Sequence, residues 1–186
     1  MASDPISQPA RPIGEMEALM DRYQRADGEA AAALVTKLSP QVFQFFLAQV
    51  RERSQAEDLL QDFWLRVHKA RHTFRTGEPL LPWIYAIARR TRVDQYRRTK
   101  HIRSHEFQSE ELPDIGPGAT ASHTLPKLAD LLKTLPAAQR ETILLLKVQG
   151  LSLDEVARAT ASSVGAVKQR AHRAYEKLRK VFGDRP

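Results

Sequence analysis

The sequence predicts an all-α protein made of two small helical domains that a flexible linker joins. Apolar residues recur at spacings of three and four through most of the chain, which is the period of an amphipathic helix, and alternating β-branched runs bounded by turns are missing. The stretch 99–126 has no such period and contains Gly-Pro-Gly at 116–118, which neither a helix nor a central strand accommodates. We therefore expect a disordered N-terminus (1–13), an N-terminal domain (14–99), a linker (100–125) and a C-terminal domain (126–186).

Composition narrows the class of partner. The chain has 186 residues, a formal net charge of +7 and no cysteine. Positive charge favours a polyanionic partner, either nucleic acid or an anionic membrane surface. The absence of cysteine excludes disulfides, thiol catalysis and cysteine-based metal sites. The polar start MASDPISQPARPI has no apolar signal core, and no apolar run approaches the ~20 residues of a spanning helix, so we expect a cytoplasmic protein without membrane insertion.

Three helices are expected before residue 51. Apolar residues from Met16 to Tyr23 mark the first, which ends near Asp27, and Ala30–Leu38 forms a short second one. Ser39 offers an N-cap and Pro40 a first-turn proline for a third. The third helix should bury Val42, Phe43, Phe46, Leu47 and Val50.

The next helix should have one apolar and one acidic side. Ser54 and Glu57 have the spacing of a capping box, which predicts a helix start at this point. The apolar side is expected to comprise Leu59, Leu60, Phe63, Trp64 and Val67. The polar side is expected to comprise Asp58, Gln61 and Asp62.

A basic helix with aromatic residues follows at 81–103. Placing residues at 100° steps gives a buried face of Ile84, Ile87, Ala88 and Thr91. One flank then holds Tyr85, Arg89, Arg92 and Tyr96, and the other holds Trp83, Arg90 and Arg97. Rings interleaved with arginines suit unstacked bases on a charged backbone. The alternative is that the rings are core residues and the arginines are solvated, and for Trp83 alone the two interpretations weigh equally.

The C-terminal part has the form of a helix-turn-helix. Apolar residues from Leu128 to Leu135 restart the helical period, Pro136 opens the next helix, and Gly150 stands where a left-handed C-terminal cap is favoured. A second capping box, Ser152 to Glu155, opens a short helix. A tight turn at 161–163 and a long basic helix from Val164 follow, as in DNA-binding helix-turn-helix motifs.

The last helix is expected to bury one face and to read DNA with the other. The buried face comprises Val164, Val167, Ala171, Ala174, Leu178 and Val181. Planar donors and acceptors for base edges, with cations for phosphates on the flanks, are expected at Lys168, Gln169, Arg170, His172, Arg173 and Lys177. The alternative is an ordinary solvated basic face.

The runs AEDLLQDFWLRVHKARHTF (56–74), PWIYAIARRTRVDQYRR (82–98) and the stretch from LPAAQRETILLL to RAYEKLR (135–179) carry a family resemblance. In this order they resemble a bacterial RNA polymerase sigma factor of the extracytoplasmic-function group of the sigma-70 family. The resemblance extends from about Met16 to Val181. It implies a protein without catalytic activity or cofactor that directs core polymerase to promoters, with one domain melting the minus-ten element and the other binding the minus-thirty-five element.

The resemblance also implies roles for individual residues. Asp58, Gln61 and Asp62 match the surface that docks on the clamp helices of the polymerase β′ subunit, and the C-terminal domain would lie on the β flap. The loop Phe74–Pro82 resembles the one that captures a flipped base. Contacts to the minus-ten strand are implied for Trp83, Tyr85, Arg89, Arg90, Arg92 and Arg97. The family usually has asparagine at the position of Arg90, and an anti-sigma factor usually accompanies its members.

Two alternatives to a sigma factor remain at the level of sequence. One is a DNA-binding regulator that uses only the C-terminal helix-turn-helix, with the N-terminal helices serving dimerisation or sensing. The other is an enzyme or metal-responsive protein, because His68 and His72, and likewise His101 and His105, are spaced i, i+4. No third metal ligand is evident and no glutamate stands between the first pair, so we expect no metal site.

Overall fold

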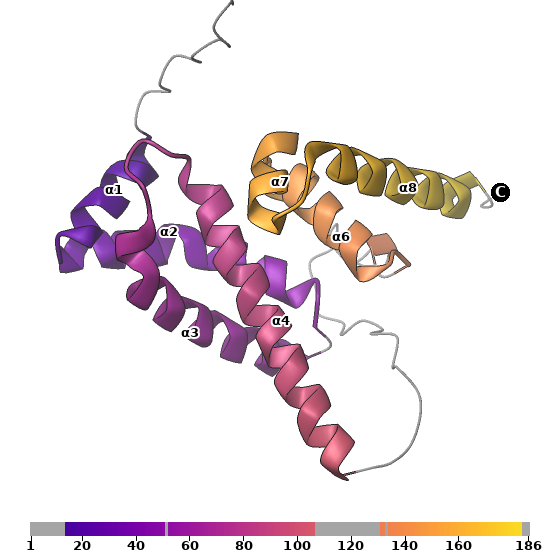
Figure 1. Ribbon diagram of the computed structural model, residues 1–186, viewed down its shortest axis with the longest axis horizontal. Coiled ribbons are helices and arrows are strands. Elements are labelled where there is room, and N and C mark those ends of the chain that lie inside the picture. The colour runs from indigo at the N-terminus through magenta and orange to yellow at the C-terminus, as the bar shows by residue number, and fades with distance from the viewer. Residues whose placement is uncertain (1–13, 51, 107–130, 133, 184–186) are drawn as a thin grey trace, which may run out of the picture.

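The computed structural model describes residues 14–50, 52–106, 131–132 and 134–183, and the side chains of 101–106 and 181–183 are outside this description. The described residues form helices and turns with no strand, which confirms the all-α prediction (Figure 1). The elements are α1 (Glu15–Gln24), α2 (Gly28–Leu47), α3 (Arg53–Ala70), the short η1 (Arg71–Thr73), α4 (Leu80–Glu106), α6 (Ala137–Ile143), η2 (Leu144–Val148), α7 (Leu153–Thr160) and α8 (Val164–Gly183). The expected disordered N-terminus, 1–13, lies outside the described residues.

The first four helices pack around one aromatic-rich core. Phe46 of α2 meets Phe63 of α3 edge-on with ring centroids 6.1 Å apart, and Phe45 meets Tyr85 of α4 in the same way at 5.3 Å. Edge-to-face pairs of this kind stabilise beyond the burial of their area. The buried side chains around them are Met20, Leu34, Leu38, Val42, Leu59, Val67, Leu80, Ile84 and Ala88.

A single helix, α2, replaces the two that we expected between Ala30 and Val50. Pro40 lies inside it, so the prediction of a helix start at Ser39 is wrong. The Ser39 hydroxyl instead accepts a hydrogen bond of 2.9 Å from Nε1 of Trp64 on α3. Buried residues on both sides of the proline, including Leu38 and Val42, share one face, and their packing outweighs the backbone hydrogen bond that proline cannot donate.

The predicted capping box at Ser54 is also wrong. Helix α3 begins two residues earlier, at Arg53, with Glu52 instead of Ser54 in the N-cap position and no side-chain cap. Glu57 binds Arg53 at 2.8 Å across one turn, and the Arg53 guanidinium lies 5.1 Å from the centre of the Phe43 ring. These two contacts of Arg53 favour the earlier start over the box geometry.

Helix α4 continues past the point where its apolar period ends. It reaches Glu106, so the beginning of the segment expected as a linker, 100–106, is helical. Lysine, arginine and glutamate are good helix formers, and a helix can continue in them after its buried stripe has ended. The remainder of the expected linker, 107–125, lies outside the described residues.

The C-terminal helices follow the predicted local chemistry closely. Gly150 has φ +69°, and the reciprocal capping box between Ser152 and Glu155 opens α7. Leu151 N donates to Leu145 O across this cap, and Gln149 N reaches back to Leu144 O, one residue beyond the α-helical partner. The turn and the long α8 then start at the predicted positions.

The two groups of helices are in contact in this structure. Helix α4 lies against α7, as Figure 1 shows for the magenta and orange ribbons. The buried apolar side chains of both groups belong to one connected cluster. The position of α4 between the two groups decides which of its faces remain exposed.

The turn of the helix-turn-helix contains a strained residue that suggests a stability test. Ala161 has φ +50°, a left-handed conformation that costs an L-residue roughly 1–2 kcal/mol because its Cβ crowds the backbone. We expect Ala161→Gly to raise the free energy of unfolding by roughly 0.5–1 kcal/mol after the entropy of glycine is subtracted. Thermal unfolding followed by circular dichroism measures this as a melting temperature a few degrees higher. The matched control Ala159→Gly, in regular helix, should lower it, and the same sign for both would contradict the argument.

Candidate nucleic-acid and polymerase interfaces

The outward face of α8 presents the side chains predicted to read DNA. Lys168, Gln169, Arg173 and Lys177 are exposed, while Val167 and Ala174 on the other side are buried against the C-terminal helices. Ser163 caps the start of the helix by accepting a hydrogen bond from Ala166 N. The small residues that follow allow the backbone to approach a groove closely. The face and its flanks therefore lie where the sequence predicted them.

Two of the predicted base-reading or phosphate-binding residues have contacts within the chain. Arg170 is half-buried and donates to the Ser162 hydroxyl at 2.9 Å, which ties α8 to the turn before it. His172 is exposed, with Nε2 3.3 Å from a carboxylate oxygen of Glu176. Arg170 thus stabilises the turn of the helix-turn-helix, whereas His172 remains on the accessible face.

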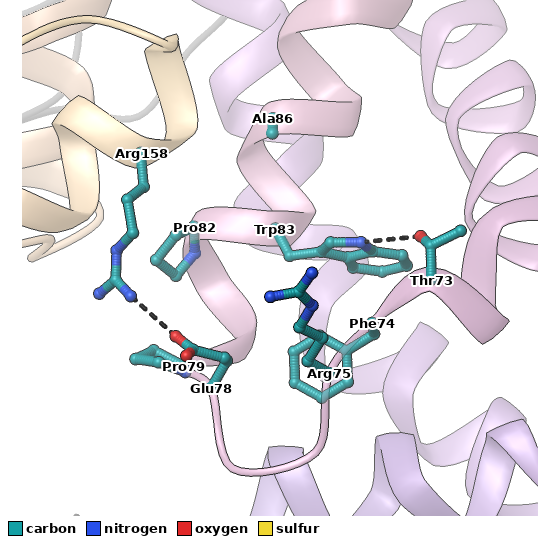
Figure 2. Close-up of a pocket in the computed structure, with 9 residues that line it drawn as sticks. All are labelled: Thr73, Phe74, Arg75, Glu78, Pro79, Pro82, Trp83, Ala86 and Arg158. Atoms are coloured by element: carbon teal, nitrogen blue, oxygen red, sulfur yellow. Dashed lines mark hydrogen bonds and ion pairs between the residues drawn. The ribbon is translucent and has the colours of Figure 1, made fainter.

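A pocket of about 300 Å³ lies between the loop that precedes α4 and the first turns of that helix. Figure 2 shows Trp83 at its centre, with the indole Nε1 donating to the Thr73 hydroxyl at 3.3 Å. The Trp83 ring also meets Phe74 edge-on at 5.7 Å, so its orientation is fixed from two sides. The lining residues are Thr73, Phe74, Arg75, Glu78, Pro79, Pro82, Trp83, Ala86 and Arg158. An aromatic side chain with a fixed orientation, next to a cationic side chain, suits a nucleotide, because the base can stack on the ring and the cation can pair with the phosphate.

One flank of α4 is accessible next to this pocket. Trp83 is half-buried, and Arg90 and Arg97 are exposed. One part of the Trp83 indole packs on Phe74 and another part lines the pocket, so Trp83 is only partly a core residue, and its contact with bases stays a prediction. Together these three residues form a surface, here called the open flank.

The other flank of α4 is covered over part of its length, which corrects our placement of Tyr85. Its side chain is buried in the core, and its hydroxyl donates to Gln149 Oε1 of the C-terminal helices at 2.5 Å. Burial raises the pKa of the Tyr85 phenol far above its usual value. The projection put Tyr85 on an accessible side, whereas α4 is enclosed over a wider arc because it packs on two sets of helices.

Arg89 and Arg92 lie on this covered flank and share one carboxylate. Arg89 Nε donates to Glu141 Oε2 of α6 at 3.2 Å, and Arg92 Nη2 lies 3.8 Å from Glu141 Oε1. Burial lowers the pKa of Arg92, and the nearby Glu141 carboxylate opposes that shift. The partner role of Glu141 was not predicted, because in the sequence it is one of the polar residues that precede the apolar run 143–146.

The acidic side of α3 is accessible, but one of its carboxylates, Asp62, already has an ion-pair partner within the chain. Asp58 and Gln61 are exposed. Asp62 accepts a hydrogen bond of 3.1 Å from Arg66, and Arg66 also donates to Asp94 of α4 at 2.6 Å. The hydrogen bond from Arg66 lowers the pKa of Asp94, and the same bond raises the pKa of Arg66. This ion-pair bridge between α3 and α4 was also not anticipated.

The histidines are not arranged as a metal site in the described part of the chain. His68 Nδ1 lies 2.8 Å from the Tyr23 hydroxyl, and His72 belongs to the short η1 turn. Among the described residues no group of three or more potential ligands comes together. The side chains of His101 and His105 lie outside the description. None of the described helices has the length and apolar character needed to cross a membrane.

Comparison with family models agrees with this architecture. Residues 34–102 match Sigma-70 region 2, and residues 125–178 match Sigma-70, region 4. The chain is 32% identical over 171 residues to the RNA polymerase sigma factor CarQ of Myxococcus xanthus, covering 89% of this chain and 96% of that protein. It is 32% identical over 176 residues to the ECF RNA polymerase sigma factor SigD of Mycobacterium tuberculosis, covering 88% and 82%.

Solved structures agree as well. CnrH, in complex with the cytosolic domain of CnrY, has a TM-score of 0.71 at 23% identity over 91% of this chain and 99% of that chain, which shows a common fold. The sigma factor RpoE of Bartonella quintana, in complex with the anti-sigma factor NepR, has a TM-score of 0.66 at 27% identity over 81% and 96%. The family models and these relatives thus define a sigma-70 type transcription initiation factor. The chain belongs to the extracytoplasmic-function (ECF) group of this family.

Proposed function

We propose that this sigma factor docks on core polymerase through α3, holds the melted minus-ten strand on the open flank of α4, and reads the upstream element with α8. The division of labour follows the expected domains, 14–99 and 126–186. The observation that supports the proposal is the coexistence of two different surfaces whose side chains suit DNA. One is the exposed reading face of α8, and the other is the Trp83 pocket beside Arg90 and Arg97.

A stand-alone helix-turn-helix regulator accounts for only one of these surfaces. It needs no aromatic pocket in its other domain, whereas promoter melting requires a place that holds an unpaired base. We further propose that the protein works in the cytoplasm and has no catalytic activity of its own. We propose too that an anti-sigma factor holds it inactive, because the similar sigma factor RpoE is bound to the anti-sigma factor NepR in its solved structure.

The direct test of the proposal is run-off transcription with core polymerase and genomic promoter fragments. Discrete transcripts should appear only when the chain is added to core. A chain that binds the same fragments but yields no initiation with core polymerase would favour the regulator.

Docking on core polymerase should depend on Asp58. It is exposed on the acidic side of α3, and Asp58→Lys would present a cation where the proposed partner surface is basic. We expect weaker binding to core enzyme with unchanged helicity, measured by fluorescence anisotropy and circular dichroism. Asp58 is a cleaner probe than Asp62, because Asp62 also binds Arg66. The control Glu29→Lys makes the same charge change on α2, and equal losses from both would remove α3 from the interface.

Upstream-element recognition should separate base readers from phosphate binders on α8. Gln169→Ala and Arg173→Ala should each cost roughly 1–3 kcal/mol on the preferred element and relax the preference at one base. Lys177→Ala should weaken all sequences alike and lower the salt dependence by about one phosphate contact. Holoenzyme binding to a randomised upstream element, followed by sequencing, measures both effects. Uniform losses for all three variants would show that α8 does not read bases with these residues.

Promoter melting should depend on the Trp83 pocket. Trp83→Ala removes the ring that stacks or packs against an unpaired base, so open-complex formation should fall more than binding to duplex promoter. Trp83→Phe keeps a ring and should retain most of the activity, and Arg90→Ala should change the base preference at the upstream edge of the melted region. Permanganate reactivity of melted thymines beside filter binding measures the difference.

A template with a pre-melted bubble provides the control for this prediction. It should rescue the defect of Trp83→Ala, because the cost of unstacking has already been met. Equal loss on duplex and bubble templates would assign Trp83 to folding alone.

A further inference from the structure

The contact between α4 and the C-terminal helices includes charged and polar side chains of the proposed DNA-binding surface, beside the apolar side chains of the shared cluster. Glu141 is buried, with 6% of its side chain exposed, and it lies against Arg89 and Arg92, whose side chains are 39% and 18% exposed. Glu141 is more than 45 residues away from both arginines in the sequence. The contact therefore exists only when the two groups of helices are together.

Hydrogen bonding in this contact is incomplete. Arg92 Nε and Glu141 Oε1 are buried, and neither has a hydrogen-bond partner among the described residues. The 3.8 Å between Arg92 Nη2 and Glu141 Oε1 is an ion-pair distance but is too long for a hydrogen bond. A buried guanidinium with an unused N–H is poorly compensated for the water it has lost. A phosphate, with several acceptor oxygens, can take the Nε and Nη hydrogens of one arginine together.

Two further contacts join the same groups of helices nearer the start of α4. Tyr85 binds Gln149 within the core, and at the loop before α4 Arg158 of α7 binds Glu78 at 2.9 Å. Figure 2 shows Arg158 reaching from α7 to the rim of the pocket that holds Trp83. The closed arrangement therefore covers one arginine flank of α4 and borders the pocket.

We propose that Glu141 is an internal substitute for a DNA phosphate, which occupies Arg89 and Arg92 while the helices are closed and which the backbone of the minus-ten strand displaces when they open. This inference rests on the proposed function, since it takes Arg89 and Arg92 as strand contacts. Helix α6 would then inhibit its own chain, because Glu141 keeps the free sigma factor from binding single-stranded DNA through Arg89 and Arg92. The 24 residues 107–130 between the two groups can span up to roughly 80 Å when extended, so the chain permits the separation.

Glu141→Gln tests the proposal because it removes the charge and keeps the shape. The probe is a fluorescein-labelled oligothymidylate, and fluorescence anisotropy gives its affinity for the full-length chain at several salt concentrations. We expect affinity to rise roughly 5- to 150-fold, the usual range of a coupling between two states. Two newly available arginines should also steepen the slope of log affinity against log salt by about 1.4, at about 0.7 per phosphate on a single strand.

Opening itself is measured separately by energy transfer. The chain has no cysteine, so Gln55→Cys on α3 and Lys180→Cys on α8 provide two unique labelling positions. Glu141→Gln should lower the transfer efficiency between the two dyes. Tyr85→Phe, which removes the hydroxyl that binds Gln149, should lower it as well and tests the closure without a change of charge.

Asp154→Asn is the matched control, because it removes one exposed negative charge from α7. It should leave energy transfer and the salt slope unchanged. If Glu141→Gln behaves like Asp154→Asn in both measurements, the proposal is overturned. Circular dichroism melting establishes that each variant is folded before it is compared.

A triple variant separates this proposal from the proposed function. Adding Arg89→Ala and Arg92→Ala to Glu141→Gln should abolish the gain in strand affinity while the helices stay open. An open triple variant that binds as tightly as Glu141→Gln means that these arginines are not strand contacts, which refutes that part of the proposed function. A Glu141→Gln chain that opens without any gain in affinity overturns the masking role alone.

Discussion

The packing of α4 on both sides is the constraint on which the rest of this structure depends. Its buried stripe, which includes Ile84, Tyr85 and Ala88, joins the core of the N-terminal helices, and its next face lies against α7. This packing covers part of one flank of α4 and leaves the open flank accessible to solvent. Because the Trp83 pocket and the exposed Arg90 and Arg97 are on that flank, the core packing decides where a strand can be held.

The Arg66 bridge links this helix to the proposed docking surface. Arg66 donates to Asp62 on its own helix and to Asp94 on α4, with the shorter bond to Asp94. If a partner cation recruits Asp62, Arg66 keeps a carboxylate and α4 keeps its position. The arrangement therefore allows one side of α3 to engage polymerase without loosening the helix that holds DNA.

Local chemistry explains what the sequence could predict. The cap at Gly150, the box from Ser152 to Glu155 and the start of α8 depend on a few neighbouring residues, and each lies where it was expected. Ser39 failed as a cap because a distant tryptophan, Trp64, takes its hydroxyl, and such tertiary contacts override local preference.

The reading face of α8 and the open flank of α4 followed from helical periodicity together with charge. The covered flank did not, because periodicity describes one helix at a time. Glu141 lies 52 residues from Arg89 in the sequence, and only the contact between helix groups brings them together. Helical periodicity, applied to α4 alone, predicts that Arg89 and Arg92 are cations facing solvent, because it does not include the contact with the C-terminal helices.

Magnitudes indicate why a closed arrangement of this kind can be opened by DNA. The exposed Glu78–Arg158 pair belongs to a class worth about 0–1 kcal/mol, and the Tyr85 hydrogen bond to one worth about 0.5–1.5 kcal/mol net. The buried Glu141 pair adds little after desolvation, since two of its polar atoms are unsatisfied. Moving a two-state equilibrium from 1:99 to 99:1 takes about 5.5 kcal/mol of differential binding. The polar contacts of the closure, a few kcal/mol together, are within that reach, and the apolar contacts that the two groups of helices share add to what DNA must overcome.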